Sequence, residues 1–420
     1  MKGLKSLLIC ALAVTGAVSL TSCGDTTSDF KVGVILVGDE SEGYSEAHIE
    51  GVKAAQEALG LKDDQILYKK KIGEDNTCLT SAQELVSNGC SLVISNSYGH
   101  QDFIYQAATQ YKDVTFVSDT GDYAALTGLD NFKNAFTDIY QSRYVSGIVG
   151  GLKLKELIDG NKLSASNKDT SGNYKIGYVG AYKYAEVISG YTAFFLGVQS
   201  IVSNVSMEVQ FTSSWFDVDK ENQAATALVN DGCVIIGQHA DSTGAPAACE
   251  SLLNSGKVCY SVGYNVDMAT AAPNAALTSA TNNWGAFYKY AFKKAMSGEG
   301  KGITTDWAEG YDTDAVGLTA LTKNVAAGTQ TAVDTAVAAI KAGTLHVFDT
   351  SKFTVSGANI TSNIVDFACY DYSGTTPTVK FAGEKKETVK TSGSTSYVEE
   401  SVERSAPYFS LQIDGITWKN

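Results

Sequence analysis

The sequence lacks the residue patterns on which most enzymes and metal sites depend. Its 420 residues include only four histidines, which leaves little room for histidine-based catalysis. No GxSxG, HExxH or GxGxxG pattern occurs, and neither does GxxxxGK followed by Ser or Thr. No CxxC pair or Cys/His cluster has the spacing of a zinc site. We therefore expect a protein that is not an enzyme and that holds neither a metal nor a cofactor.

Positive charge and long apolar runs are also scarce. The formal net charge is −14, and such an acidic chain argues against binding to nucleic acid and against charge-driven binding to anionic lipid. Beyond the N-terminal region, no stretch is long and apolar enough to span a membrane.

The N-terminal residues are typical of an export signal. Lys2 and Lys5 precede an apolar or small run of 14 residues, Leu7 to Leu20, which is too short for a membrane-spanning helix. The following Leu-Thr-Ser-Cys-Gly resembles a bacterial lipobox, in which Cys23 is acylated. We expect a lipoprotein signal peptide at 1–22, a tether at 23–30 and a lipid anchor on the extracytoplasmic face of the cell membrane. The alternative is an ordinary secretory signal with a coincidental cysteine.

Cysteine usage beyond Cys10 and Cys23 indicates buried thiols. Cys90 and Cys233 each follow a glycine and begin an apolar run, as residues at the start of buried strands do. A Cys78–Cys90 disulfide is an alternative that the sequence does not decide.

From residue 31 onward, short apolar runs alternate with segments of helical period. Strands expected in the first half are 31–37, 66–68, 91–95 and 114–117, with helices at 46–59, 80–87 and 103–110. After a long helix at 141–157, the second half repeats the layout. Its expected strands are 175–179, 207–211, 233–237 and 258–262, and its expected helices are 186–200, 220–230 and 245–255. Such alternation predicts right-handed βαβ units and parallel sheets.

Two similar halves predict an α/β protein of two doubly wound, Rossmann-like lobes with a ligand cleft between them, like a type I periplasmic binding protein. Later helices are expected at 284–296 and 331–342. We expect the first lobe at 31–140 plus about 281–330, and the second at 141–280 plus about 331–373. The segment 374–420, rich in Thr, Ser, Gly and Lys, is expected to be an exposed β or loop extension.

Residues that directly follow the expected strands should line the cleft, and an aromatic, a carboxylate or an amide recurs in these segments. Flat aromatics suit a planar ring, and carboxylates accept hydrogen bonds from ribose hydroxyls. His239 and Asp241 in one such segment could instead form a general base with its orienting partner. The alternative that we favour is a hydrogen-bonding wall of a binding cleft, or a helix cap made by Asp241 and Ser242.

The order of these motifs resembles the basic membrane protein family of lipoproteins, which includes purine nucleoside receptors of ABC transporters. The resemblance runs from Lys31 to about Ile360. It is carried by Gly43-Tyr44-Ser45, Ser97-Tyr98-Gly99, Arg143 to Ile148, Trp215-Phe216-Asp217, Gln238 to Ser242, Gly263 to Met268, Asn283-Trp284-Gly285 and Gly343 to Phe348.

The resemblance implies roles for particular residues. An aromatic from each lobe would sandwich a base, with Tyr44 at the first-lobe position and Trp215 or Phe216 at the second. A ribose-binding carboxylate falls on Asp267, and another falls most nearly on Asp102. Ser45 and Asn282 stand where the family has an asparagine and a lysine, which admits a free base or another ring ligand. The full set of expected ligand-binding residues is Tyr44, Ser45, Tyr98, Asp102, Trp215, Phe216, His239, Asp241, Asp267, Asn282 and Trp284.

The resulting hypothesis is a lipid-anchored solute-binding protein that closes about a hinge on a purine nucleoside or related small ligand and serves an ABC permease and ATPase. A sensor subunit that signals to a membrane receptor, or a binding protein for a sugar or another small molecule, would use the same two lobes. The sequence does not separate these alternatives.

Overall fold

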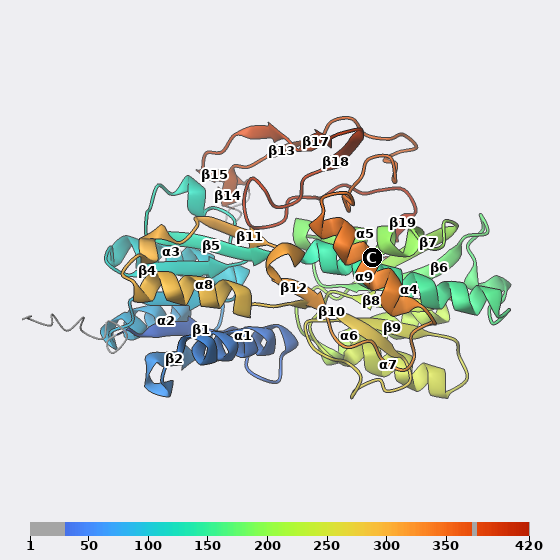
Figure 1. Ribbon diagram of the computed structural model, residues 1–420, viewed down its shortest axis with the longest axis horizontal. Coiled ribbons are helices and arrows are strands. Elements are labelled where there is room, and N and C mark those ends of the chain that lie inside the picture. The colour runs from blue at the N-terminus through green and yellow to red at the C-terminus, as the bar shows by residue number, and fades with distance from the viewer. Residues whose placement is uncertain (1–29, 372–375, 420) are drawn as a thin grey trace, which may run out of the picture.

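A computed structural model describes residues 30–371 and 376–419, so the proposed signal peptide and Cys23 lie outside the described residues. Two α/β lobes lie side by side, and a C-terminal extension runs along one side of both (Figure 1). Among the described residues, no helix has the length and apolar character needed to cross a membrane. Within the same ranges, no group of three or more His, Cys, Asp or Glu side chains is arranged to hold a metal ion.

The first lobe is a six-stranded parallel sheet with the order β11-β5-β4-β3-β1-β2. Its strands are β1 (Val32–Ile35), β2 (Ile66–Lys69), β3 (Leu92–Ser95), β4 (Thr115–Asp119), β5 (Phe132–Thr137) and β11 (Asp306–Glu309). Its helices are α1 (Gly43–Leu59), α2 (Asn76–Ser87), α3 (Gln101–Gln110) and α8 (Gly285–Met296). Every residue of β1, β3, β4 and β5 is buried, as expected for a parallel sheet covered on both faces.

The second lobe is a seven-stranded sheet with the order β12-β10-β9-β8-β6-β7-β19, in which β12 is the only antiparallel strand. Its strands are β6 (Tyr174–Gly180), β7 (Val205–Phe211), β8 (Ile235–Gln238), β9 (Tyr260–Tyr264), β10 (Ala276–Asn282), β12 (Val316–Leu318) and β19 (Ile416–Trp418). Its helices are α4 (Ile139–Asp159), α5 (Ala185–Gln199), α6 (Val218–Asn230), α7 (Gly244–Asn254) and α9 (Thr329–Lys341).

Before the C-terminal extension begins, the chain passes between the two sheets three times. It leaves the first sheet after β5 to begin α4, returns after β10 to begin α8, and leaves again between β11 and β12. The predicted return to the first lobe at about 281–330 is therefore too long, because β12 already belongs to the second sheet. These three crossings join the two sheets.

The fold agrees with the expected alternation of strands and helices, although several strands of the two sheets, namely β5, β11, β12 and β19, were not expected. β5 carries Lys133 and Asn134 in its middle, so no apolar run marks it. Asn134 is nevertheless fully buried because its side chain bonds Ser118 O and Ala124 N–H. The six cysteines of the described residues are free thiols, so a Cys78–Cys90 disulfide is not formed.

The C-terminal extension begins earlier than expected, because 350–371 belongs to it and not to the second lobe; it is largely exposed over 376–397, as its composition predicts, but is buried in places from Val398 onward. It contains β13 (Ile364–Asp366), β14 (Cys369–Asp371), β15 (Thr378–Phe381), β16 (Lys385–Glu387), β17 (Val389–Ser392) and β18 (Thr395–Val398), which pair into three small hairpin-like sheets. Tyr408 and Phe409 are buried, and Phe409 stacks on Phe348 with ring centroids 4.1 Å apart. The chain then adds β19 to the second sheet beside β7.

A buried carboxyl of this extension makes stability depend on pH. Burial raises the pKa of Glu400 from 4.5 to about 8, although Ser189 Oγ donates to Oε1. The folded protein thus holds this proton more tightly than the unfolded chain does, so stability falls as pH rises from about 4.5 towards 8. Glutamine cannot ionise, so Glu400→Gln should gain stability relative to the parent by about 1.4 kcal/mol for each pH unit in that window. Scanning calorimetry across the window measures this gain; a difference independent of pH would contradict it.

Candidate ligand-binding site

A cavity of about 320 Å³ lies between the two lobes. It meets the carboxyl ends of β1, β3 and β4 in the first lobe and of β6, β7, β8 and β9 in the second, which is where open α/β sheets bind ligands. The volume is at the lower end of the range for small-molecule sites. Its lining residues are Val37, Gly38, Asp39, Ser41, Glu42, Tyr44, Lys71, Glu74, Asn96, Ser97, Tyr98, Thr120, Glu186, Trp215, Phe216, His239, Asp241 and Tyr264.

Aromatic side chains from both lobes face this cavity. Tyr44 is fixed at the start of α1, because its hydroxyl donates to Asn96 O at 2.7 Å and its ring meets His48 edge-on at 4.6 Å. Trp215 follows β7 and packs edge-on against Tyr182 with centroids 5.0 Å apart. Tyr98 is 46% exposed and Phe216 40% exposed, so both retain ring surface that a ligand can cover.

Five carboxylates line the cavity, and Lys71 is the one lysine or arginine among the described lining residues. Lys71 is already paired with Asp39 at 2.6 Å. Glu42 caps α1 by accepting the backbone N–H groups of Tyr44 and Ser45, and burial raises the pKa of its carboxyl. The cavity therefore offers hydrogen-bond acceptors, which favours a ligand rich in hydroxyl or amino donors.

His239 is held as a neutral ring that orients a carboxylate. Arg143 Nη2 lies 3.3 Å from His239 Nδ1, and since arginine can only donate, Nδ1 is the acceptor and Nε2 carries the proton. Nε2 then donates to Glu186 Oε1 at 3.0 Å. Burial first, and Arg143 second, lower the pKa of His239, in keeping with a neutral imidazole.

These contacts bear on the alternative role of His239 as a general base. Both of its ring nitrogens are engaged, and its expected orienting partner Asp241 instead accepts from Asn265 Nδ2 at 2.9 Å. Burial raises the pKa of Asp241 well above its ordinary value, and the nearby Glu42 adds to this effect. The structure thus favours a hydrogen-bonding wall over a catalytic pair.

Trp284 lies in the core rather than in the cleft. It is fully buried, stacks on His48 at 4.1 Å, and fits against Gly51, where an added Cβ would stand 2.7 Å from Trp284 Cβ. Its position at the start of α8 anchors that helix on α1. The expected ligand-binding role of Trp284 is therefore corrected to packing.

Four other expected site residues also lie outside the cavity. Ser45 is buried behind it and accepts the Gly38 N–H. Asn282 donates to the Tyr264 hydroxyl and to Asn265. Asp267 caps its own turn through Ala269 N–H, and Asp102 on α3 pairs with Lys380 of the extension. These four side chains support the cleft walls or the surface, while Tyr44, Tyr98, Trp215, Phe216, His239 and Asp241 meet at the cavity.

Several lining residues were not selected from the sequence. Glu42, Glu186 and Tyr264 stand in the segments that directly follow the expected strands. Their positions could therefore have identified them, but other residues of these segments were selected. Glu74 lies between β2 and α2, and it reaches the cavity by accepting from Ser97 Oγ and the Gly99 N–H. No strand-end pattern marked Glu74.

Two doubly wound lobes, joined by three crossings and separated by this cleft, have the fold of the type I periplasmic binding proteins. A solved solute-binding protein of an ABC transporter system from Conexibacter woesei has the same fold, with a TM-score of 0.56, 20% identity, and coverage of 76% of this chain and 98% of that one. At this identity the likeness concerns the fold.

Sequence comparison gives the family. The family model described as "ABC transporter substrate-binding protein PnrA-like" matches residues 30–349, and the chain belongs to that family, the basic membrane proteins. A purine-binding protein of Brucella abortus is 29% identical over 297 residues, covering 70% of this chain and 77% of the relative. A putative ABC transporter glucose-binding protein of Haloferax volcanii is 26% identical over 265 residues, covering 63% and 60%.

Proposed function

We propose that this chain is the extracytoplasmic solute-binding protein of an ABC importer, anchored through Cys23, and that it binds a purine nucleoside or a related ring ligand by hinge closure. The observation that carries the proposal is the placement of Tyr44 and Trp215 on opposite lobes of one cavity, together with surplus carboxylates. Rings supply stacking surface for a planar base, and carboxylates supply acceptors for ribose hydroxyls. The purine-binding relative supports the same ligand class.

The lining residues are divided between the two lobes, and this division explains why a bound ligand would close the lobes around itself. Tyr44, Glu42 and Glu74 belong to the first lobe, while Trp215, Glu186 and Asp241 belong to the second. A ligand that touches both sets completes its contacts only in the closed arrangement, so its binding shifts the hinge equilibrium towards that arrangement. The closed form is then the state presented to a permease and its ATPase.

Titration calorimetry with adenosine, guanosine, inosine, adenine and glucose tests the ligand class. We expect the purine nucleosides to bind in the micromolar range or tighter, because stacking at roughly 1–3 kcal/mol per ring and several hydrogen bonds at about 1 kcal/mol each add up to that affinity. Glucose should bind more weakly than every nucleoside. Glucose as the sole binder, as the name of the Haloferax relative suggests for that protein, would contradict the proposal.

A further inference from the structure

The C-terminal extension forms one wall of a second compartment of the cleft. This compartment has a volume of about 630 Å³ and shares Tyr98, Thr120, Glu186 and Trp215 with the first cavity, so the two are adjacent. Its other wall comes from the extension, through Asp366, Ala368, Cys369, Tyr370, Arg404, Ala406 and Pro407. The extension begins after residue 349, where the match to the family model ends.

Contacts to both lobes fix this wall in place. On the second lobe, β19 extends the sheet beside β7, and Trp418 Nε1 donates to the Tyr191 hydroxyl at 2.9 Å. On the first lobe, the Ser405 N–H and hydroxyl donate to Asp306 at 3.1 and 3.2 Å, and Phe381 packs on Tyr123 at 5.0 Å. The extension runs across both lobes in Figure 1.

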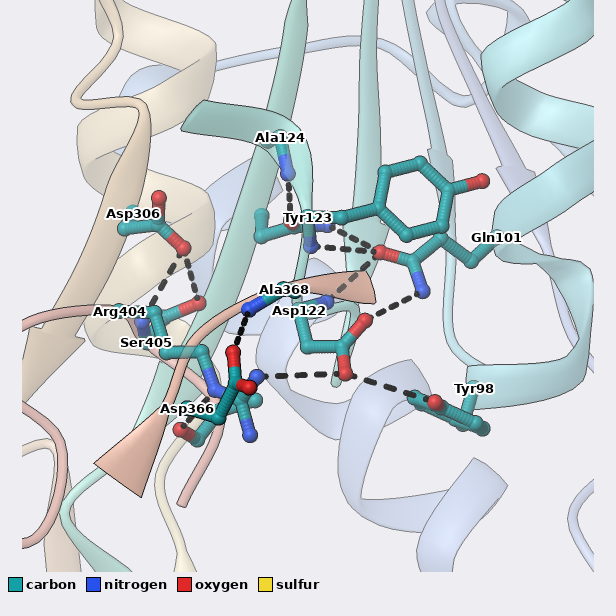
Figure 2. Close-up of polar contacts among 12 residues, drawn as sticks. Tyr98, Gln101, Asp122, Tyr123, Ala124, Asp306, Asp366, Ala368, Arg404 and Ser405 are labelled. Carbon is teal, nitrogen blue, oxygen red and sulfur yellow. Dashed lines mark hydrogen bonds and ion pairs between the residues drawn. The ribbon is translucent and has the colours of Figure 1, made fainter. Parts of the chain in front are cut away.

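Arg404 joins this wall to an aromatic of the first cavity. Its Nη1 lies 3.5 Å from Asp122 Oδ2, which is also 3.5 Å from the Tyr98 hydroxyl. Figure 2 shows Asp122 between Tyr98 on one side and Arg404 on the other. The Phe367 ring lies 5.6 Å from the guanidinium carbon, and Arg404 Nε donates to Ala406 O. The side chain is 19% exposed, so it is held in place but remains accessible.

The compartment is lined by three carboxylates, and its Arg404 guanidinium has one donor group without an acceptor among the described residues. Asp122 accepts from Gln101, Asp366 from the Ala368 N–H, and Glu186 from His239. Within the described ranges, Arg404 Nη2 meets no acceptor. A guanidinium N–H without an acceptor fits an acidic or carbonyl group of a ligand.

We propose that the extension is part of the ligand site and that Arg404 is a specificity-determining residue for a ring ligand with an acidic or carbonyl-bearing arm. The ring occupies the first cavity, between aromatics and carboxylates, and the arm passes Tyr98 into the second compartment. This inference rests on the proposed function, because it places the ring of the proposed ligand in the first cavity.

Calorimetry with three probes tests this assignment: adenosine, adenosine 5′-monophosphate with its arm on the sugar, and N6-succinyladenosine with its arm on the base. We expect at least one arm-bearing probe to bind the parent protein fivefold tighter than adenosine. Arg404→Gln should abolish that gain and leave adenosine affinity within twofold. Lys380→Gln, which breaks an extension contact to Asp102 outside the compartment, should leave all three affinities within twofold.

The outcomes separate the two proposals. Adenosine binding with no gain from either arm, or an equal loss for all three probes in Arg404→Gln, overturns the role of Arg404 and leaves the proposed function standing. Failure of all three probes to bind overturns the proposed function itself. The melting temperature of Arg404→Gln, measured alongside, shows that its binding data come from folded protein.

Discussion

Replacing Trp215 with alanine is expected to weaken nucleoside binding at least tenfold, about 1.4 kcal/mol, without unfolding the protein. The indole lines the cavity from the second lobe and is only partly buried, so its loss removes ring contact with a ligand and only a peripheral part of the packing. Stacking of a base on an aromatic side chain contributes roughly 1–3 kcal/mol, which sets the size of the expected loss.

Calorimetric titration of adenosine or guanosine into Trp215→Ala measures this loss. Val218→Ala is a matched control, because Val218 stands three residues further on, is 45% exposed and does not line the cavity. The control should retain parental affinity, and both variants should melt within a few degrees of the parent. Unchanged nucleoside affinity in Trp215→Ala would show that the ligand does not stack on this residue.

A single methyl group between α4 and α5 is expected to cost the fold on the order of 3 kcal/mol. The two helices cross at Gly147 and Gly197, where an added Cβ would stand 2.2 Å from Phe194 O and 2.0 Å from Tyr144 O respectively. Both obstructing atoms belong to the backbone, so no side-chain rotation can relieve the clash, and Gly197→Ala forces the helices apart.

Thermal unfolding of Gly197→Ala measures this cost. Gly317→Ala is the control, because a Cβ there would find its nearest neighbour, Thr281 Oγ1, at an ordinary 3.5 Å. We expect a marked fall in melting temperature for the first variant and little change for the second. Equal melting temperatures for Gly197→Ala and the parent would show that α4 and α5 are not packed as closely as described.

The sequence predicted most of the fold because buried parallel strands leave a simple pattern. The runs KVGVILV and KIGYVGA are continuous, apolar and bounded by polar residues, and they became β1 and β6. β5 was not predicted because Lys133 and Asn134 interrupt its run of apolar residues. Only tertiary contacts make these two residues compatible with burial. The composition of the extension likewise did not predict that it packs on the lobes, because only a few buried residues, such as Tyr408 and Phe409, attach this otherwise polar segment to them.

The sequence predicted several residues of the candidate site that directly follow a strand and point into the cavity. Tyr44, Trp215 and His239 follow strands and meet at the cavity, as the parallel topology requires. Asp267 and Trp284 follow β9 and β10, but their side chains turn to a local cap and to the core, and sequence position alone does not give that direction. Arg404 was not predicted: it stands more than a hundred residues after the last cleft residue expected from the sequence, and only the folded chain brings it beside Asp122.

A crystal structure with the tightest-binding nucleoside of the calorimetric panel tests the central claim most directly. We predict a planar ring between Tyr44 and Trp215, with ligand hydroxyl or amino groups on the carboxylates of Glu74 or Glu186 and the lobes closed around it. A nucleoside bound outside the interlobe cavity, or one that contacts a single lobe, would contradict this account of the molecule.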